Sequence, residues 1–287
     1  MSTSALQQIS QQSHQMTSRF VAADGLHWRI VETGTGNGPI VLLIHGTAAS
    51  VHSWRDVMPL LAKTHHVIAV DLPGHGLTKY KSASDLSLHR MGKGIVALLA
   101  AMNHVPEIVV GHSAGAAILA WVCGRKYFTP KRLVSFNGAF YPFAGISGSL
   151  FGPMAKLVAL NPFVPRLLST VASRATVEKL LKDTGSTITP EGVGLYYDLF
   201  KDQTHVAAAL GMMAAWDLRG MDDNFKTMTA HGIFVAGNND KAVPPETANR
   251  AAAHCRSAEV VRIAGFGHLL HEENPGLAAN IIRGVKT

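Results

Sequence analysis

The chain has 287 residues, of which 47% are hydrophobic and 16% are charged. This length suffices for one large α/β domain with an insertion, and the composition is typical of a globular protein and excludes a disordered chain. Two cysteines cannot form a disulfide framework. They indicate a reducing compartment, so we expect a cytoplasmic protein.

The formal net charge of +7 is unevenly distributed. Residues 141–229 hold equal numbers of acidic and basic side chains, so the excess lies in the remainder of the chain. Basic residues cluster at 79–93 and at 125–132, and neither cluster belongs to a nucleic-acid-binding motif. We therefore expect solvated surfaces, no nucleic-acid partner, and at most a loose association with an anionic membrane surface.

The first 18 residues carry no charged side chain and no continuous apolar run. We expect a mobile tail there, rather than a signal peptide or a membrane anchor. The next segments, 19–23 and 27–32, flank Asp24-Gly25, a dipeptide typical of the two-residue turn of a β-hairpin. Residues 40–45 (IVLLIH) form a continuous apolar run, as expected for a central strand of a parallel sheet.

From there on, predicted strands alternate with predicted helices. The strands are expected at 66–70, 107–110, 132–136, 233–236 and 259–263, and the helices at 54–63, 86–102, 114–123, 246–255 and from Pro275 onward. Such alternation is typical of a parallel sheet with helices on both faces. The sequence therefore predicts an α/β fold with a mostly parallel, eight-stranded sheet.

Residues 141–229 break this alternation, since they hold several prolines and helical patterns but no convincing strand. We expect a helical cap there, between two parts of the core at 19–140 and 230–287, above the carboxyl ends of the strands. One uncharged stretch, Leu133–Ala155, is long enough to span a bilayer. Its glycines and prolines instead favour a strand followed by a flexible connection into the cap.

The motif GHSAG places Ser113 between Gly111 and Gly115, after a short apolar strand and before an apolar helix. Small neighbours allow the sharp turn that exposes a nucleophilic serine, and the helix that follows directs its amide groups toward a developing oxyanion. We therefore expect Ser113 to be the nucleophile and the Ala114 N–H to belong to the oxyanion hole. The alternative is a glycine-rich turn with a helix-capping serine.

A nucleophilic serine needs a base, and the base needs an orienting acid. His268 lies in a glycine-flanked loop after the last predicted strand, so it is our candidate base, whereas His271 is expected at the surface or at a helix start. Asp240 follows the strand at 233–236 and is our candidate acid. The other position for an acid, at the end of the sixth strand, holds Asn137, which carries no charge. His112 adjoins the serine, and we expect it to be a packed loop residue.

A second oxyanion donor is expected from Thr47, because the motif HGT ends the first central strand. The segment 205–218 is apolar on nearly every helical face, which predicts either the roof of an apolar pocket or simply the core of the cap. The residues expected to line this pocket are Phe140, Met212, Met213, Trp216 and Leu269. The histidines are scattered and no carboxylate cluster suits an oxygen-ligand site, so we expect neither a metal nor another cofactor.

The motifs HGT, DLPGHG, GHSAG, GNNDKAVPP and GFGH occur in this order over residues 40–275. Together they resemble the α/β-hydrolase fold family. The stretches HSWRDVMPLLA, LLKDTGSTITPEG and HVAAALGMMAAWDL further resemble a subgroup of that family, the magnesium-chelatase accessory proteins of bacteriochlorophyll biosynthesis. Ala48 departs from the glycine expected after HGT, which concerns the detailed geometry of the oxyanion loop.

This resemblance implies a serine hydrolase that cleaves an ester or related acyl bond of a small apolar or tetrapyrrole-like substrate. It also implies magnesium chelatase or other enzymes of that pathway as partners. The fold hosts many functions, so two alternatives stay open. One is a non-catalytic module that binds porphyrin or assists the chelatase, and the other is a cofactor-free enzyme of the haloperoxidase or perhydrolase type.

Overall fold

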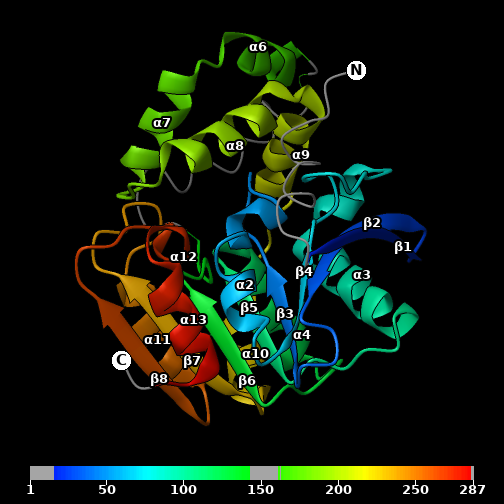
Figure 1. The fold of residues 1–287 in the computed structure, drawn as a ribbon, viewed down its shortest axis with the longest axis vertical. Coiled ribbons are helices and arrows are strands. Elements are labelled where there is room, and N and C mark those ends of the chain that lie inside the picture. Colours follow the sequence, from blue (N-terminus) through cyan, green and yellow to red (C-terminus); the bar gives the residue numbers. More distant parts are fainter. Residues whose placement is uncertain (1–15, 143–160, 162, 286–287) are drawn as a thin grey trace.

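The computed structural model describes residues 16–142, 161 and 163–285. At its centre is one sheet of eight strands in the order β1-β2-β4-β3-β5-β6-β7-β8 (Figure 1). The strands are β1 Thr17–Ala23, β2 Leu26–Thr33, β3 Ile40–Ile44, β4 His66–Val70, β5 Ile108–His112, β6 Arg132–Phe136, β7 His231–Gly237 and β8 Ala258–Ile263. This arrangement confirms the predicted fold class.

The sheet is antiparallel at one edge and parallel elsewhere. β1 and β2 form the predicted hairpin, and β2 pairs antiparallel with β4. All remaining neighbours are parallel. β1 begins at Thr17, two residues before the predicted strand, and most of the expected N-terminal tail lies outside the described residues.

Helices cover both faces of the sheet (Figure 1). One face packs against α3 (Leu88–Ala101), α4 (Ala114–Gly124) and α11 (Glu246–His254), and the other against α2 (Met58–Leu61), α12 (Leu270–Glu273) and α13 (Pro275–Arg283). The helix predicted at 54–63 is instead a 3-10 turn, η1 (Val51–Trp54), followed by α2. Pro59 stands in the first turn of α2, where a residue without an N–H is tolerated, so the helix starts anew there.

The chain between β6 and β7 contains only helices among its described residues. They are α6 (Phe163–Val171), α7 (Arg174–Asp183), α8 (Pro190–Lys201), α9 (Gln203–Ala214) and α10 (Met221–Thr227). The first four form a separate layer above one end of the sheet (Figure 1). α10 instead packs against α4 and α11, so the helical layer ends before the predicted boundary at residue 229. The flexible connection expected within 133–155 falls largely outside the described residues.

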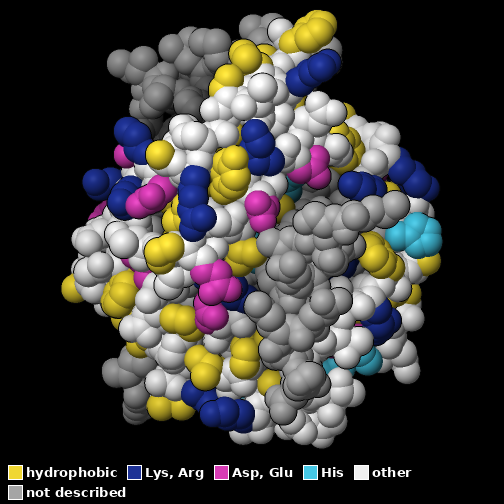
Figure 2. Space-filling model, turned by 45° about the horizontal axis from the view of Figure 1, so that its top comes forward, with side chains coloured by type: hydrophobic (Ala, Val, Ile, Leu, Met, Phe, Trp, Pro, Cys, Tyr) yellow, Lys and Arg dark blue, Asp and Glu magenta, His cyan; other side chains and the backbone are white. Residues whose placement is uncertain are grey.

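The face seen in Figure 2 mixes acidic and basic side chains without a continuous field of one sign. Within the described ranges, no helix combines the length and the apolar character needed to cross a membrane. Both cysteines in this part of the chain are free thiols.

Candidate active site

Ser113 occupies a strained turn between β5 and α4. Its backbone angles are φ 50° and ψ −115°, outside the regions that side chains ordinarily adopt. A Cβ on Gly111 would collide with the backbone of Ala116, and one on Gly115 with the carbonyl of Ile44, so both glycines are required for this turn. The Ser113 side chain is partly exposed, which fits the predicted nucleophile elbow.

The loop after β3 passes directly beside Ser113. A Cβ on Gly46 would lie 3.1 Å from the Cβ of Ser113 and 2.8 Å from Nδ1 of His112. Thr47 follows, and its Oγ1 donates a hydrogen bond of 3.5 Å to the sulfur of Met212 on α9. Ala48 has φ 61°, a left-handed value that favours glycine, which explains why glycine is expected there. Of the predicted oxyanion donors, Ala114 follows the serine in the chain, and Thr47 follows Gly46, which packs against the serine.

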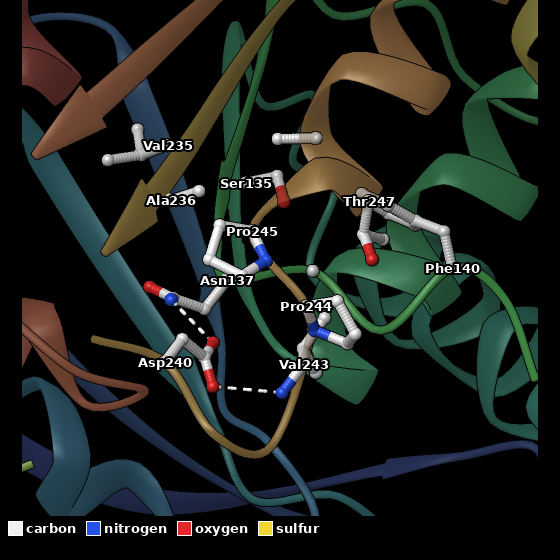
Figure 3. Close-up of a pocket in the computed structure, with 12 residues that line it drawn as sticks. Ser135, Asn137, Phe140, Val235, Ala236, Asp240, Val243, Pro244, Pro245 and Thr247 are labelled. Atoms are coloured by element: carbon white, nitrogen blue, oxygen red, sulfur yellow. Dashed lines mark hydrogen bonds between the residues drawn. The ribbon is translucent and has the colours of Figure 1, made fainter. Parts of the chain in front are cut away.

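Asp240 follows β7 and holds the ring of His268. The Asp240 Oδ2 atom accepts a hydrogen bond of 2.8 Å from His268 Nδ1, and Oδ1 accepts one of 2.8 Å from the Ala242 N–H. Oδ1 also accepts from the Val243 N–H at 2.8 Å (Figure 3). The carboxyl is fully buried. With Nδ1 facing the acid, the other ring nitrogen of His268 is left for proton transfer.

Asn137 is part of the same cluster, a contact that the sequence reasoning missed. It follows β6, and its Nδ2 donates to Asp240 Oδ2 at 2.6 Å (Figure 3). Its own φ of 50° is tolerated better by Asn than by most residues. The adjacency of β6 and β7 brings these two strand ends together. Asn137, at the position where we considered an acid and rejected it, is therefore a direct hydrogen-bond partner of Asp240, the acid that we chose.

His112 contacts the loop that carries the candidate base. It is the last residue of β5, is buried, and its Nε2 lies 2.9 Å from the backbone oxygen of His268. Burial lowers the pKa of His112 well below its usual value, so the ring stays neutral and can donate to this carbonyl. It is a packed residue, as expected, and it fixes the position of the His268 backbone.

The residues predicted to line the pocket lie in different environments. Met212 is fully buried beside Thr47, and Leu269 packs with Tyr196 at the junction between the helical layer and the sheet. Met213 is 41% exposed, and Trp216 packs partly buried against the main core. Their contact with a substrate stays a prediction.

Phe140 lies in the hydrophobic core. It is 1% exposed and contacts the rings of Phe225 and Phe234 edge to face. It also borders a cavity of about 10 Å³ beside Asp240, which holds at most one water molecule (Figure 3). This placement gives no support to the expectation that Phe140 forms the floor of a substrate pocket.

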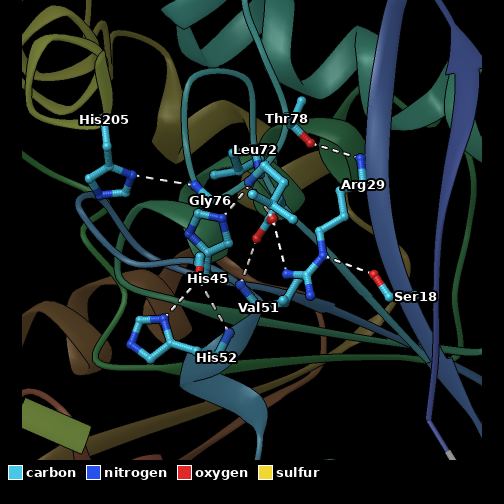
Figure 4. Close-up of polar contacts among 12 residues, drawn as sticks. Ser18, Arg29, His45, Val51, His52, Leu72, Gly76, Thr78 and His205 are labelled. Atoms are coloured by element: carbon cyan, nitrogen blue, oxygen red, sulfur yellow. Dashed lines mark hydrogen bonds and ion pairs between the residues drawn. The ribbon is translucent and has the colours of Figure 1, made fainter. Parts of the chain in front are cut away.

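A buried carboxylate, Asp71, joins loops near the candidate oxyanion turn, and two of its partners, Arg29 and Val51, are labelled in Figure 4. Its Oδ1 accepts from the N–H of Val51 at 2.8 Å, and its Oδ2 from the N–H of Leu77 at 2.9 Å and from Arg29 Nη1 at 3.3 Å. The bonds from Val51 and Arg29 join segments 20 and 42 residues away from Asp71, whereas the bond from Leu77 closes a local loop. Asp71 therefore acts as a structural anchor for the site rather than as its acid.

His45 contacts both the candidate oxyanion turn and the segment after β4. Its Nδ1 lies 2.7 Å from the carbonyl of Gly46, and its Nε2 accepts from the N–H of Leu72 at 3.0 Å. Burial lowers the pKa of His45, so the ring is neutral, and these partners place its proton on Nδ1. The side chain of His45, which belongs to the HGT motif itself, thus fixes the segment that precedes Thr47.

A second serine–histidine pair lies nearby. His271, expected at the surface or at a helix start, lies in the first turn of α12 but is fully buried, and its Nε2 lies 2.6 Å from Ser53 Oγ. Ser53 also donates to Glu272 at 3.0 Å, and Glu272 accepts from Tyr196 at 2.7 Å and from Arg55 at 2.8 Å. Tyr196 belongs to α8, so this cluster fastens the helical layer to the core.

A model of the alpha/beta hydrolase family matches residues 41–280, and the chain belongs to that family. It is 36% identical over 249 residues to the magnesium-chelatase 30 kDa subunit of Rhodobacter capsulatus, an alignment that covers 86% of each protein. An alpha/beta hydrolase fold protein from Burkholderia ambifaria superposes with a TM-score of 0.77 at 21% identity, covering 94% of this chain and 99% of that one. A serine hydrolase involved in carbazole degradation gives a TM-score of 0.73 at 24% identity, with 94% and 98% covered. These two likenesses show a shared fold.

Proposed function

We propose that this protein is a serine hydrolase in which Ser113 is the nucleophile, His268 the general base and Asp240 the orienting acid. The observation that carries the proposal is the buried Asp240–His268 pair, whose imidazole lies 4.7 Å from the ring of His112, the residue that precedes a serine with a strained backbone. Strained backbone is retained where function requires it, and a buried carboxylate facing Nδ1 of an imidazole is the arrangement that directs a histidine toward a serine.

The reaction begins when His268 takes the proton of the Ser113 hydroxyl and the serine oxygen attacks the carbonyl carbon of an ester or related acyl bond. The N–H groups of Ala114 and Thr47 stabilise the resulting oxyanion, and the amide groups at the start of α4 add to this stabilisation. His268 then gives its proton to the leaving group, and the same residues activate water to release the acyl group.

The substrate is proposed to be apolar and to belong to tetrapyrrole metabolism. Met212 and Leu269 present apolar side chains next to the candidate oxyanion loop and the base, respectively. The tetrapyrrole assignment rests on the similarity to a relative named as a subunit of magnesium chelatase. That similarity also makes the chelatase or another enzyme of its pathway the proposed partner.

The mechanism is tested by labelling the purified protein with a fluorophosphonate, followed by turnover of esters of increasing acyl chain length. Labelling is expected in the wild type and is expected to be lost in Ser113→Ala, with turnover lower by several orders of magnitude. Ser53→Ala is the matched control, since Ser53 also faces a histidine but is buried, so it should keep its label. Turnover of Ser113→Ala within tenfold of the wild type would exclude this mechanism.

A second candidate function is a non-catalytic accessory module that binds a porphyrin, which the name of the 36% identical relative favours. The two functions separate in a bacteriochlorophyll-producing strain that carries only the Ser113→Ala form. Normal pigment formation there would support the accessory role, whereas loss of pigment with retained porphyrin binding would support the enzyme.

Binding by either candidate is measured by porphyrin quenching of tryptophan fluorescence. If Trp216 stacks on a flat ligand, Trp216→Ala should weaken binding by about 1–3 kcal/mol. Trp54→Phe serves as the control, because Trp54 is fully buried on the other face of the sheet and cannot contact the ligand.

A further inference from the structure

Three side chains that the proposed reaction does not use converge at the antiparallel part of the sheet. They are Glu32 on β2, His66 on β4 and His104, which lies between α3 and β5. Glu32 Oε1 is 3.3 Å from His66 Nε2 and 3.8 Å from His104 Nε2. All three atoms lie within 4.8 Å of one another.

The strand pairing explains why these residues meet. Glu32 is directly opposite Ile68, and His66 stands two residues before Ile68, so both side chains point to the face covered by α3. His66 is the first residue of β4, whereas Ser113 follows the last residue of the parallel strand β5. The cluster therefore lies at the opposite end of the sheet from the candidate active site.

The donor atoms are suited to a metal ion. Ligands about 2.0 Å from a tetrahedral Zn²⁺ lie about 3.3 Å apart, so a small contraction of the cluster would complete three of four positions. His66 is 7% exposed, and no described residue makes a hydrogen bond to its Nε2, the atom that faces Glu32. A buried imidazole nitrogen without such a partner is costly unless something binds it.

The other contacts of Glu32 and the exposure of His104 are also consistent with a metal site. Arg19 Nε donates to Glu32 Oε2 at 2.6 Å, which fixes the carboxylate so that Oε1 faces the imidazoles. The side chain of His104 is 25% exposed, which gives an ion a path from solvent. Two imidazoles and one carboxylate favour a divalent transition metal and suit Mg²⁺ poorly, since Mg²⁺ prefers oxygen ligands.

We propose that Glu32, His66 and His104 form a binding site for Zn²⁺ or a chemically similar divalent transition metal, with the fourth position open to water. The ion would join β2, β4 and the segment before β5. It would thereby stabilise the antiparallel edge of the sheet without taking part in hydrolysis.

The experiment uses full-length, tag-free protein treated with a chelator and then titrated with ZnCl₂ by calorimetry. One Zn²⁺ per chain is expected, and Zn²⁺ at about 100 times Kd should raise Tm by about 5 °C or more. His104→Ala and Glu32→Gln should each weaken binding at least tenfold and remove this shift. His65→Ala is the matched control and should behave as the wild type, because His65 faces Thr64 instead.

His104→Ala keeps the test valid if His66→Ala fails to fold, because His104 is the most exposed of the three ligands. Absence of one-to-one binding in the wild type would overturn the proposal. So would wild-type affinity in both His104→Ala and Glu32→Gln, which would mean that scattered surface histidines bind the ion. Binding of MgCl₂ with equal affinity at this site would overturn the choice of metal.

Discussion

Two groups of serine, histidine and acid lie close together in this protein, and we propose that only one of them is catalytic. The first holds Ser113, His268 and Asp240, and the second holds Ser53, His271 and Glu272. Ser113 is partly exposed at a strained turn, whereas Ser53 is 2% exposed in a 3-10 turn.

The two groups also differ in how the acid is connected. Asp240 bonds to Nδ1 of His268, while Glu272 bonds to Ser53, Tyr196 and Arg55, and no hydrogen bond to Nδ1 of His271 is found in the described structure. On the proposed function, a serine, a histidine and an acid close to one another are therefore insufficient for catalysis. Reactivity requires an accessible hydroxyl and an acid that faces the imidazole, whereas a buried group of the same composition joins parts of the fold.

The largest difference between the groups is expected from removing each histidine. His268→Ala should lower kcat/KM by about 10⁴-fold to 10⁶-fold, because the base is lost. His271→Ala should destabilise the fold by a few kcal/mol through an unfilled buried site, with turnover of the folded fraction within tenfold of the wild type. Ester turnover and urea unfolding of both variants measure this, and similar turnover losses for the two would remove the distinction.

The acid gives the next largest effect. Asp240→Asn should lower turnover about 10⁴-fold, because the amide no longer stabilises the imidazolium or its tautomer. Asn137→Ala removes one donor to the carboxylate and should lower turnover less than tenfold. Its melting temperature should fall nonetheless, because Ala tolerates a φ of 50° less well. A greater turnover loss for Asn137→Ala than for Asp240→Asn would reverse the assignment of the acid.

A fall in pH should lower the free energy of unfolding, because several histidines are buried in the second group and around it. Among the described residues, burial lowers the pKa of seven histidines. That of His205 falls to about 4, and the others are the buried His45, His52, His75, His112 and His271 and the partly exposed His65. The unfolded chain therefore binds more protons, so stability is present above pH 6.5 and is lost as the pH falls toward about 4.

Each such histidine adds up to about 1.4 kcal/mol per pH unit to this slope. Glu272 and Asp198, whose pKa values are raised by burial, act in the opposite direction as two groups against seven. Urea unfolding at about pH 7.5, 6.5 and 5.5 measures the slope. A free energy of unfolding that stays constant over this range would contradict the account.

The smallest effect is expected where the second group meets the helical layer. Tyr196→Phe removes the hydrogen bond to the buried Glu272 and should lower the free energy of unfolding by about 2 kcal/mol. Tyr197→Phe is the control, because the adjacent hydroxyl makes no hydrogen bond that we find in the described residues, and its effect should stay below about 0.5 kcal/mol. Equal effects for the two tyrosines would show that the Tyr196–Glu272 bond does not stabilise the fold.

Local sequence patterns were sufficient for the central fold. The strands at 66–70 and 132–136 match the prediction at both ends, because continuous apolar runs bounded by polar residues are the pattern of a buried parallel strand. The prediction of one helix at 54–63 was wrong because of Pro59, which the periodicity of apolar residues does not take into account. Ser113, Asp240 and His268 could be proposed because each follows a strand in a recognisable motif.

Contacts between distant segments account for the rest. His271 stands beside two glutamates and a helix start, which indicates a surface, but its burial depends on Ser53, 218 residues away. The bond from Asn137 to Asp240 depends on the pairing of β6 with β7. Likewise, Glu32 and His66 share a face only because β2 pairs antiparallel with β4, a register that neither strand's own pattern specifies.

The hydrogen bond between Asn137 and Asp240 also bears on how such sites diverge. Two strand ends, those of β6 and β7, both reach the same edge of the His268 region, and at present one carries the negative charge and the other a neutral amide. Exchanging the two residue types would move the charge from one strand to the other by about the length of one hydrogen bond. Two substitutions at adjacent strand ends would thus relocate the proposed acid while the serine, the histidine and the sheet stay in place.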